Sequence, residues 1–522
     1  MCAKRKAPYG KSKIHIPAEA YSDVRVLYIH PAKQGVDFRV DETMGRAYGL
    51  MPVGLPALVN LLKQNGIAVR GINYSLERQI DPTYDIKHWL KHNPVAQIIL
   101  IDLHWYEHCY GAIQAARLCK EVLPHAYIVL GGLTATCFSS QILEQFPAVD
   151  FIIRGDAEKA LLALTQRILQ ASESCSFSDI PNLSYRDNQA IVENDCTYCA
   201  NTSDLDELNF ADIDFIDHYR DYYIHEYIVT DIAAAQQALQ SKPFWGKWIC
   251  TARGCKHECS YCGGCKSAHK TLANRDGIVI RSPQAVVNEI QQLYKTGVIQ
   301  ASLSYDISEL GDEYWQDFFA MLANSGTKIG IYNEFFQLPK PEFIQEFARR
   351  AYMPHSCLAL SPLSGSERVR RLNGKLFTNE HLLDTLELLN QVYTNIFVYF
   401  SLNLPGETEE IFNETVDLAN LIYDSYPHSR LKILNTIHTI DPLSPMNLHP
   451  EKFEIESSMS TFMDYYTYCE NTQLASPDAK TENYRGFKLA DPDKRVLERM
   501  VKTWDAQRPG KEDSWWPVPP SW

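Results

Sequence analysis

The sequence predicts an α/β protein in which an N-terminal doubly wound, Rossmann-like domain precedes a partial (β/α)6 barrel and a small C-terminal segment. Three observations support this prediction. Short apolar runs alternate with helical segments up to about residue 170, the alternation resumes near residue 245 with six further strands, and it stops before the last segment. Because strands separated by helices form parallel sheets with right-handed crossovers, both repeated stretches should be parallel α/β domains.

These changes of pattern also give the expected boundaries. We expect the Rossmann-like domain over residues 1–175, a connecting region over 176–240, the barrel over 241–445 and the C-terminal segment over 446–522. A chain of 522 residues is too long for one compact core, which agrees with several domains.

The strands of the first domain are short apolar runs such as "RVLYIH". They are expected at residues 25–30, 68–74, 97–104, 126–132 and 149–155. The clearest helix is "PVGLPALVNLLKQNG", in which Leu55, Leu58 and Leu62 share one face and Gly66 stands at the C-terminal cap. In a doubly wound sheet the ligand lies at the carboxyl ends of the strands.

The barrel strands are expected at residues 247–251, 299–306, 328–335, 355–362, 395–405 and 431–440. One helix between them, "SPQAVVNEIQQLYKTG", begins at a capping residue, Ser282, and closes at Gly297. In βα barrels the chemistry sits on the loops that follow the strands. The cysteine-rich loop of this chain directly follows the first barrel strand.

The composition narrows the function classes. A formal net charge of -14 argues against broad nucleic-acid contact, which needs a basic surface. The basic start, "MCAKRKAPYGKSK", is not followed by the apolar core of a signal peptide, and no apolar run is long enough to cross a bilayer. We therefore expect a cytoplasmic protein, where disulfides are rare and 14 cysteines indicate metal or redox chemistry.

The stretch "TARGCKHECSYCGGCKSAHK" places four cysteines close together, at Cys255, Cys259, Cys262 and Cys265. A zinc site normally uses two C-x2-C pairs with a spacer, and no spacer is present here. A ferredoxin-like run has its longest gap last and a proline after it, whereas here the longest gap comes first and Lys266 follows. In a third interpretation, the first three cysteines hold three irons of a four-iron cluster and leave one iron open for a ligand.

With Tyr261 just before the third cysteine, "GCKHECSYC" resembles the radical S-adenosylmethionine (SAM) superfamily. The resemblance implies that Cys255, Cys259 and Cys262 ligate a [4Fe–4S] cluster whose open iron binds SAM. It also implies that one electron cleaves SAM to a 5′-deoxyadenosyl radical, which abstracts hydrogen from the substrate. The protein of such an enzyme orients the cofactor and excludes water.

Two downstream segments resemble SAM-binding motifs of this family. "NLPGET" resembles a turn after the fifth strand, which makes Asn403 and Pro405 candidate contacts. "SPLSGSERVRRLNGK" resembles the fourth-strand segment, but Leu363 replaces the usual glutamate. Ribose contacts are therefore expected from Ser361, from Ser364 or from another strand, and strand-end capping is the alternative role for all of these residues.

The family's "GGE" motif after the second strand is absent. "SYDISEL" stands in its place, as in the cobalamin-linked branch of the family, and Asp306 is a candidate substitute. Glu334, at the end of the third strand, is another polar candidate for SAM binding. A capping role is again the alternative.

A doubly wound domain before such a barrel resembles the cobalamin-binding branch. The matching segments are "PVGLPALVNLLKQNG", "DLHWYEHCYGAIQAARLCKEVLP", "VLGGLTAT" and "VDFIIRGDAEKALLAL". The resemblance implies that Gly131 and Gly132 let the backbone approach the nucleotide tail. It also implies that two loops border the corrin, with candidate contacts at Trp105, Tyr106, Gly155 and Asp156. The alternative is a domain that has lost cobalamin and serves as a scaffold.

The segment "DLHWYE" resembles the D-x-H-x-x-G signature, whose histidine ligates cobalt. It departs from the signature at Glu107, where glycine is expected, and it follows the third strand rather than the first. We therefore assign neither His104 nor His108 as a cobalt ligand and expect hydrogen-bonded loop residues there.

Some cysteines and aromatics are left over. Cys265 is a candidate hydrogen donor, a ligand of an auxiliary site or a residue without a role. Cys196 and Cys199 have C-x-x-C spacing but lack the strand-to-helix setting of a redox motif, so a second metal site is an alternative there. The aromatic C-terminal segment is expected either to cap the barrel over an apolar, planar substrate or to form a small packing module.

Taken together, the residues and the resemblance predict a cobalamin-dependent radical SAM enzyme that methylates an unreactive carbon, with no catalytic residue assigned. The alternatives are a cyclase, an oxidase or a carbon–carbon coupling enzyme on the same scaffold. From another class, an iron–sulfur electron carrier or a zinc-stabilised binding module remains open. The expected partners are a small-molecule, lipid or peptide substrate and an external reductant such as flavodoxin or ferredoxin, without nucleic acid.

Overall fold

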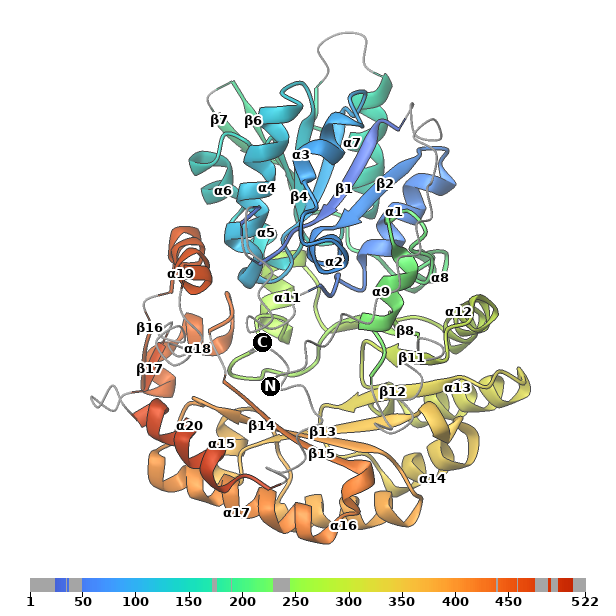
Figure 1. The fold of residues 1–522 in the computed structure, drawn as a ribbon, viewed down its shortest axis with the longest axis vertical. Coiled ribbons are helices and arrows are strands. Elements are labelled where there is room, and N and C mark those ends of the chain that lie inside the picture. Colours follow the sequence, from blue (N-terminus) through green and yellow to red (C-terminus); the bar gives the residue numbers. More distant parts are fainter. Residues whose placement is uncertain are drawn as a thin grey trace, which may run out of the picture.

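The computed structural model describes residues 24–33, 35–36, 49–170, 176–188, 190–228, 245–437, 440–457, 459–474, 487–489 and 496–509. Two α/β domains lie one above the other along the long axis of the molecule (Figure 1). Helix α5 (Leu133–Cys137), which follows a strand of the first sheet, contacts helix α11 (Lys266–Ala273), which follows the cysteine loop. The carboxyl end of the first sheet therefore faces the barrel.

The first domain is built on a seven-stranded sheet in the order β2-β1-β3-β4-β5-β6-β7. Its strands are β1 (Val26–His30), β2 (Val69–Asn73), β3 (Ile98–Asp102), β4 (Tyr127–Gly131), β5 (Phe151–Ile153), β6 (Leu183–Asp187) and β7 (Ala190–Glu193). β1 to β5 are parallel, and the sheet changes direction of growth between β1 and β3. That point is the topological switch point, where doubly wound sheets bind their ligands.

Helices cover both faces of this sheet. They are α1 (Leu55–Gln64), α2 (Tyr74–Ile80), α3 (Ile86–Lys91), α4 (Cys109–Val122), α5, α6 (Ser139–Gln145) and α7 (Glu158–Gln170). Two more short helices, α8 (Thr202–Asp206) and α9 (Tyr219–His225), lead toward the barrel. The predicted α/β class with parallel sheets is confirmed.

The barrel sheet has six parallel strands in the order β15-β14-β13-β12-β11-β8. They are β8 (Gly246–Ile249), β11 (Gln300–Leu303), β12 (Gly330–Phe335), β13 (Cys357–Leu363), β14 (Ile396–Leu402) and β15 (Leu431–Ile437). The helices around it are α12 (Pro283–Thr296), α13 (Asp312–Asn324), α14 (Pro341–Arg350), α15 (Glu367–Leu372), α16 (Asn379–Gln391) and α17 (Glu409–Ser425). Ser282 caps α12 by accepting from Ala285 N, and Gly297 ends that helix with φ +100°, as the sequence predicts.

The structure adds two hairpins that the sequence analysis did not expect. β6 and β7 lie within the expected connecting region, yet they extend the first sheet as antiparallel strands. The turn between them contains Asn188 with φ +55°, a residue that tolerates this conformation. A second hairpin, β9 (Ala252–Gly254) with β10 (Ile278–Ile280), flanks the cysteine loop.

The C-terminal segment packs on both domains. It contains α18 (Pro445–Leu448), β16 (Ile455–Ser457), α19 (Phe462–Leu474), β17 (Phe487–Leu489) and α20 (Val496–Gln507). The ring of Tyr466 on α19 lies 5.2 Å from that of Tyr110 on α4, and Trp504 on α20 lies 6.2 Å from Phe400 of the barrel. The described helices of this segment are thus packing elements, while Trp515 and Trp516 lie outside the described residues.

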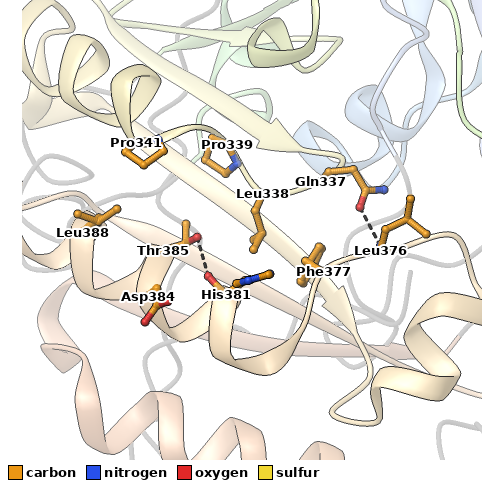
Figure 2. A pocket seen from close by; sticks show the side chains of 10 residues that line it. All are labelled: Gln337, Leu338, Pro339, Pro341, Leu376, Phe377, His381, Asp384, Thr385 and Leu388. Carbon is orange, nitrogen blue, oxygen red and sulfur yellow. Dashed lines mark hydrogen bonds between the residues drawn. The ribbon is translucent and has the colours of Figure 1, made fainter.

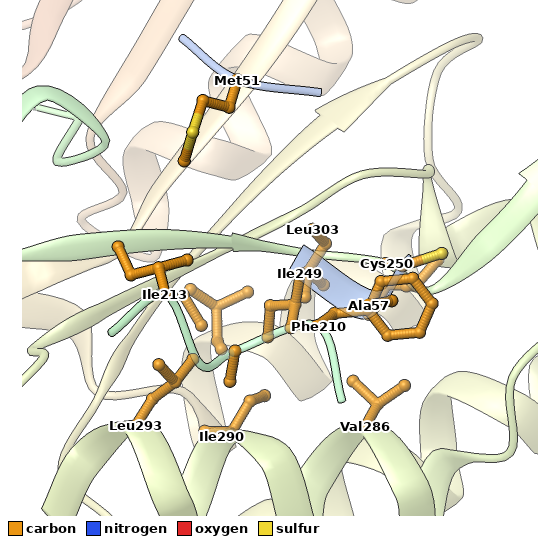
Figure 3. Packing of buried hydrophobic residues seen from close by; sticks show 14 of the residues in the cluster. Met51, Ala57, Phe210, Ile213, Ile249, Cys250, Val286, Ile290, Leu293 and Leu303 are labelled. Atoms are coloured by element: carbon orange, nitrogen blue, oxygen red, sulfur yellow. The ribbon is translucent and has the colours of Figure 1, made fainter. Parts of the chain in front are cut away.

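One apolar core continues from the first domain into the barrel (Figure 3). Ala57 of α1 belongs to the same buried cluster as Ile249 of β8 and Ile290 of α12. Phe210, from the segment between the domains, also belongs to it and is fully buried. The two domains are therefore joined by burial of apolar surface as well as by the chain.

Candidate cofactor site between the two sheets

The cysteine loop lies between β9 and α11 and is held in tight turns. Cys262 N donates to Cys259 O at 3.2 Å, and Cys265 N donates to Cys262 O at 3.3 Å. Backbone amides also point at two of the sulfurs, from His257 N to Cys255 Sγ at 3.4 Å and from Gly264 N to Cys262 Sγ at 3.3 Å. Hydrogen bonds to the sulfurs are one of the means by which proteins tune iron–sulfur clusters.

Side chains from distant loops fasten the cysteine loop. Glu309, just after β11, accepts from His257 Nε2 at 2.6 Å and pairs with Lys256 at 3.2 Å. Asp441 Oδ2, after β15, accepts from Gly263 N at 3.1 Å. The sequence analysis missed these anchors, because partners that follow other strands leave no signal in the local spacing.

Gly374 leaves room beside Cys259. It has φ +90°, and a Cβ atom there would lie 3.3 Å from Cys259 Sγ. Burial raises the pKa of the thiols of Cys255, Cys259 and Cys262, so these thiols hold their protons until a metal displaces them. A glycine cradle, directed amides and three adjacent thiols fit the predicted iron–sulfur cluster.

Cys265, Cys196 and Cys199 join no group of three metal-ligating side chains among the described residues, and a second metal site stays a prediction. Cys265 stands at the start of α11, is 1% exposed, and its Sγ lies 3.3 Å from Ser267 Oγ. Cys196 and Cys199 lie in the irregular segment after β7. Within the ranges that the structure describes, no three His, Cys, Asp or Glu side chains converge on one metal ion. A four-iron cluster holds its thiolates farther apart than a single ion does.

Tyr261 connects the cysteine loop with the barrel. Its ring packs against the buried cluster of Leu363, Val369 and Leu404, and Tyr261 and Cys259 lie close enough to shift each other's pKa. Burial raises the pKa of Tyr261, and the nearby charge of Glu334 adds to the shift. Glu334 itself accepts from Ser361 Oγ at 2.8 Å. The structure thus brings together three residues predicted to contact SAM: Tyr261, Glu334 and Ser361.

Asp306 is held inside the protein. Its carboxylate accepts hydrogen bonds from Ser308 N, Ser308 Oγ, Asn333 Nδ2 and Phe336 N, at 2.7 to 3.2 Å. Burial raises the pKa of Asp306 to about 6. These contacts give Asp306 a role in shaping the loop after β11, and a direct contact with SAM stays a prediction.

The remaining barrel candidates lie in turns. Ser364 Oγ lies 3.2 Å from Thr415 Oγ1, Asn403 adopts φ +67°, and Pro405 O accepts from Asn373 Nδ2 at 3.1 Å. These contacts fix the ends of β13 and β14 at the barrel mouth. Their predicted contacts with SAM stay predictions.

Glu407 of "NLPGET" is a buried acid that the sequence analysis did not single out. It is 3% exposed, and its Oε1 has no hydrogen-bond partner within the described part of the chain. Burial raises the pKa of Glu407 to about 8, so the carboxyl group is largely protonated at neutral pH.

We expect Glu407 to make the protein less stable as the pH rises from 4.5 to about 8. The folded state favours the protonated acid, so its contribution is complete below the unfolded pKa of 4.5 and is lost as the pH rises through the folded pKa of about 8. The loss is about 1.4 kcal/mol per pH unit. Urea unfolding of Glu407→Gln should lack this loss, and a variant that keeps the wild-type pH response would assign the effect to another group.

The barrel interior is aromatic. Tyr332, Phe397 and Tyr399 line it together with Trp248, whose ring lies 5.5 Å from that of Tyr332. Lys432 Nζ lies 5.0 Å from the centre of the Phe397 ring, as in a cation–π contact. These aromatic residues stand at alternate positions of their strands. The sequence alone does not show that they share the barrel interior, because that depends on the register between the strands.

At the carboxyl edge of the first sheet, the backbone of Gly132 lies close to the backbone of His104. It has φ +111°, and a Cβ atom there would lie 2.6 Å from His104 Cα. The same loop is held by Thr134 Oγ1, which donates to His104 O at 3.0 Å. Gly131 is more open, since a Cβ atom there would meet only Ile153 O, at 3.8 Å.

The aromatic residues at this edge have different neighbours. The ring of Trp105 lies 4.9 Å from that of His104 and is half-buried. Tyr106 is buried against Tyr465 of α19 at 5.2 Å, and its carbonyl accepts from Cys469 Sγ. Tyr106 therefore packs against the C-terminal helix α19, while Trp105 contacts the histidines of its own loop.

Gly155 and Asp156 dock the two domains. Gly155 has φ +63°, and a Cβ atom there would lie 3.0 Å from Ala273 Cα of α11. The carboxylate of Asp156 pairs with Arg253 at 3.2 Å and with Arg275, and it accepts from a backbone amide of the connecting segment. This loop therefore packs against the barrel domain and forms ion pairs with it. The predicted contact of Gly155 and Asp156 with the corrin stays a prediction.

A surface groove lies on the outer side of the barrel (Figure 2). It has a volume of about 470 Å³ and lies between the loop 337–341 and α16. Gln337 links its rim to the cluster loop, because Gln337 Nε2 donates to O of Gly374, the residue beside Cys259.

Among the described residues, no helix is both long enough and apolar enough to cross a bilayer.

Comparison with known proteins agrees with this geometry. Residues 249–419 match the family model described as the Radical SAM superfamily. The anaerobic magnesium-protoporphyrin IX monomethyl ester cyclase of Cereibacter sphaeroides is 25% identical over 72% of this chain and 58% of its own length. A tRNA-2-methylthio-N(6)-dimethylallyladenosine synthase of Thermus thermophilus is 28% identical over 40% of this chain and 44% of its own length. This chain thus spans less than two thirds of either relative.

Solved structures share the arrangement of both domains. The radical SAM methyltransferase TsrM of Kitasatospora setae, with cobalamin and a [4Fe–4S] cluster bound, has a TM-score of 0.60 at 16% identity and covers 83% of this chain and 80% of its own. The cobalamin-dependent SAM radical enzyme OxsB has a TM-score of 0.55 at 14% identity and covers 90% of this chain and 71% of its own. The prediction of a cluster, SAM and cobalamin therefore agrees with the family and the fold. Residues 249–419 thus match the radical SAM superfamily, and the two domains of this chain share the fold of TsrM and OxsB.

Proposed function

We propose that this protein is a cobalamin-dependent radical SAM enzyme that methylates an unactivated carbon of its substrate. The observation that carries the proposal is the placement of the cysteine loop. The loop is fastened at the barrel mouth and faces the carboxyl edge of a doubly wound domain. When bound, the cluster and SAM supply a 5′-deoxyadenosyl radical, and cobalamin supplies the methyl group.

In this proposal, residues of the barrel domain hold the cluster and SAM. Cys255, Cys259 and Cys262 hold the cluster, and Glu334 with Ser361 contacts SAM beside Tyr261. The 2.8 Å hydrogen bond between Glu334 and Ser361 supports this role, because it fixes both polar groups before a ligand arrives. The shared apolar core holds the two domains together.

The barrel interior favours a planar, largely apolar substrate. Trp248, Tyr332 and Phe397 offer ring faces and edges, and aromatic groups prefer stacked or edge-to-face neighbours. Lys432 adds a cation near the Phe397 ring, which suits a substrate that also carries an acidic group. An external one-electron reductant of the flavodoxin or ferredoxin type completes the proposed system.

Cyclisation without net methyl transfer is the second candidate. The relative that is 25% identical over 72% of this chain is named as a cyclase, which favours it. Oxidation and carbon–carbon coupling belong to the same non-methylating group. These reactions use the same cofactors, so the products of SAM separate them from methylation.

The test is to purify the protein without oxygen, reconstitute iron and sulfide, supply cobalamin, and add reductant and SAM. Methylation predicts both 5′-deoxyadenosine and S-adenosylhomocysteine, whereas a cyclase, oxidase or coupling enzyme yields deoxyadenosine alone. Neither product, from protein with a full cluster, would refute both candidates and return the chain to the electron-carrier class.

A further inference from the structure

The turn after α15 brings exposed protein surface close to the cysteine loop. Gly374 lies in this turn, and a Cβ atom there would be 3.3 Å from Cys259 Sγ. Leu376 stands two residues later and is 72% exposed. Two residues of chain span at most about 7 Å, which limits the distance from this exposed leucine to the contact with Cys259.

Hydrogen bonds hold this turn against the end of β12. Gln337 Nε2 donates to Gly374 O at 2.9 Å, and Leu376 N donates to Gln337 Oε1 at 2.9 Å (Figure 2). Lys375 is 4% exposed, and its Nζ donates at 2.7 Å to the carbonyl of the residue after β12. Burial raises the pKa of the Cys259 thiol and the charge of Lys375 opposes that rise, so the ammonium lies within electrostatic range of the sulfur. The turn is a fixed connection between the protein surface and the cysteine loop.

Two exposed arginines precede this turn and pair with no carboxylate of the described residues. They are Arg368 and Arg371 of α15, and Arg368 Nη2 donates to the backbone carbonyl of Gly406 at 3.0 Å. Leu372 ends the same helix and is 40% exposed. In a chain with a formal net charge of -14, this surface therefore presents two positive charges beside exposed apolar groups.

The exposed cations on the cysteine loop and α11 are paired instead. Lys256 pairs with Glu309 at 3.2 Å, while Lys266 and Lys270 pair with Asp276 at 3.5 and 3.2 Å. Their positive charge is offset by these carboxylates. A negatively charged partner is therefore attracted more strongly to the side of the two arginines.

Apolar surface continues from the turn into the groove on the outer side of the barrel. Leu376 and Phe377 line this groove with Leu338 and Pro339, and Asp384 stands at its other end (Figure 2). An apolar centre with charged groups at its rim is the usual anatomy of a protein interface. The arginine–leucine surface consists of Arg368, Arg371, Leu372 and Leu376.

We propose that the arginine–leucine surface docks an acidic one-electron carrier protein, which reduces the cluster through the turn at Gly374. The inference rests on the cluster of the proposed function and assigns its external reductant to one face of the barrel. One electron leaves the reduced carrier and enters the oxidised cluster, and no bond forms or breaks. Electron transfer slows steeply with distance, so the close approach to Cys259 favours this face. Opposite charges steer the two proteins together, and the leucines are buried in the complex.

The test uses the reconstituted protein and a flavodoxin, which is an acidic one-electron carrier. Isothermal titration calorimetry gives the Kd of the oxidised flavodoxin at several salt concentrations, and stopped-flow absorbance gives the rate at which the reduced flavodoxin reduces the cluster. We expect Arg368→Glu and Arg371→Glu each to raise the Kd and lower this rate by about tenfold at low salt, because like charges then face each other. Dithionite should reduce the cluster of both variants at the wild-type rate, since this small reductant needs no docking surface.

Two further variants separate charge at this surface from other effects. Lys295 is exposed at the end of α12, before β11, and so lies at the edge of the barrel opposite the loops. Lys295→Glu changes the net charge as each arginine variant does, but it should change the Kd by less than about twofold because salt screens distant charges. Leu376→Ala should raise the Kd without changing its salt dependence, because it removes apolar contact alone.

Three results would overturn the inference. An equal loss in Lys295→Glu would make the effect one of net charge. A wild-type Kd that does not rise with salt, or no binding of flavodoxin, would exclude an electrostatic docking surface. A slowing by dithionite as large as that by flavodoxin would assign the arginines to the structure of the cluster site.

None of these results touches the proposed function, which stands if dithionite and SAM yield 5′-deoxyadenosine in the wild type. Absence of that product from protein with a full cluster would overturn the proposed function, while the binding and reduction measurements would still decide the inference. A protein that takes up no cluster would overturn both.

Discussion

Cys259→Ala should remove the iron–sulfur cluster and reduce SAM cleavage to background. Three thiolates are the whole protein ligand set of the proposed cluster, so the loss of one leaves two, and the cofactor that supplies the radical is not held. Cys259 is also the thiol that lies close to Tyr261 and faces Gly374. Iron content, visible absorption of the cluster and 5′-deoxyadenosine would be measured on the same preparation.

Cys265→Ala is the matched control for this prediction. Cys265 is in the same loop and is buried, but its sulfur contacts Ser267 at the start of α11. We expect this variant to keep its iron and to form 5′-deoxyadenosine at a rate close to that of the wild type. Loss of iron in Cys265→Ala would instead favour four protein ligands and the electron-carrier interpretation.

The second large effect is expected at Asp156. Asp156→Asn removes the negative charge that faces Arg253 and Arg275 between the two domains. Arg253 keeps Glu158 as a partner at 2.7 Å, so the charge left buried without a carboxylate is that of Arg275. Breaking a buried ion pair by removal of one partner typically costs about 3–5 kcal/mol. We expect a loss of that size in the free energy of unfolding, measured by urea with circular dichroism, and faster proteolysis between the domains.

The pH dependence of this effect has a defined sign. Burial alone would raise the pKa of Asp156, but Arg253 and Arg275 outweigh it and hold the pKa below its ordinary range. The contribution of Asp156 is therefore present above the unfolded pKa and is lost as the pH falls through the folded pKa. The stability difference between the wild type and Asp156→Asn should shrink in acid.

Asp312→Asn is the control for charge removal as such. Asp312 pairs with Lys340 at 2.7 Å, and both side chains are more than half exposed. Exposed pairs contribute about 0–1 kcal/mol, so this variant should differ little from the wild type. An equal loss in both variants would show that the position between the domains has no special importance.

Local patterns were sufficient for the main strands of both parallel sheets, and they single out the three cysteines that are predicted to hold the cluster. The alternation of apolar runs with helices depends on burial within one element, and the three cysteines are neighbours in sequence, so both are visible without the fold. Glu309 and Asp441 were invisible for the opposite reason. Each contacts the cysteine loop from the end of another strand, and only the order of the strands brings them there.

The segment around Asp156 shows a different limit. An acidic residue after a strand end was read as a ligand contact, because such loops border ligands in doubly wound sheets. In the structure, two arginines of the barrel pair with that carboxylate, and its contact with the corrin stays a prediction. An aspartate after a strand end can contact a ligand or form an ion pair within the protein. Its role depends on which cationic side chains the fold places beside it.

The packing of α19 on α4 has a consequence for synthesis. α4 ends at Val122, and α19 begins only at Phe462, roughly 340 residues later. At a synthesis rate of about 5–20 residues per second, α19 is made roughly 20–70 s after α4. Until then, the apolar face of α4 has no helix packed on it. During that time the rings of Tyr106, Tyr110 and Phe146 lack their partners from α19. The nascent first domain therefore exposes this apolar surface until the last part of the chain has been made.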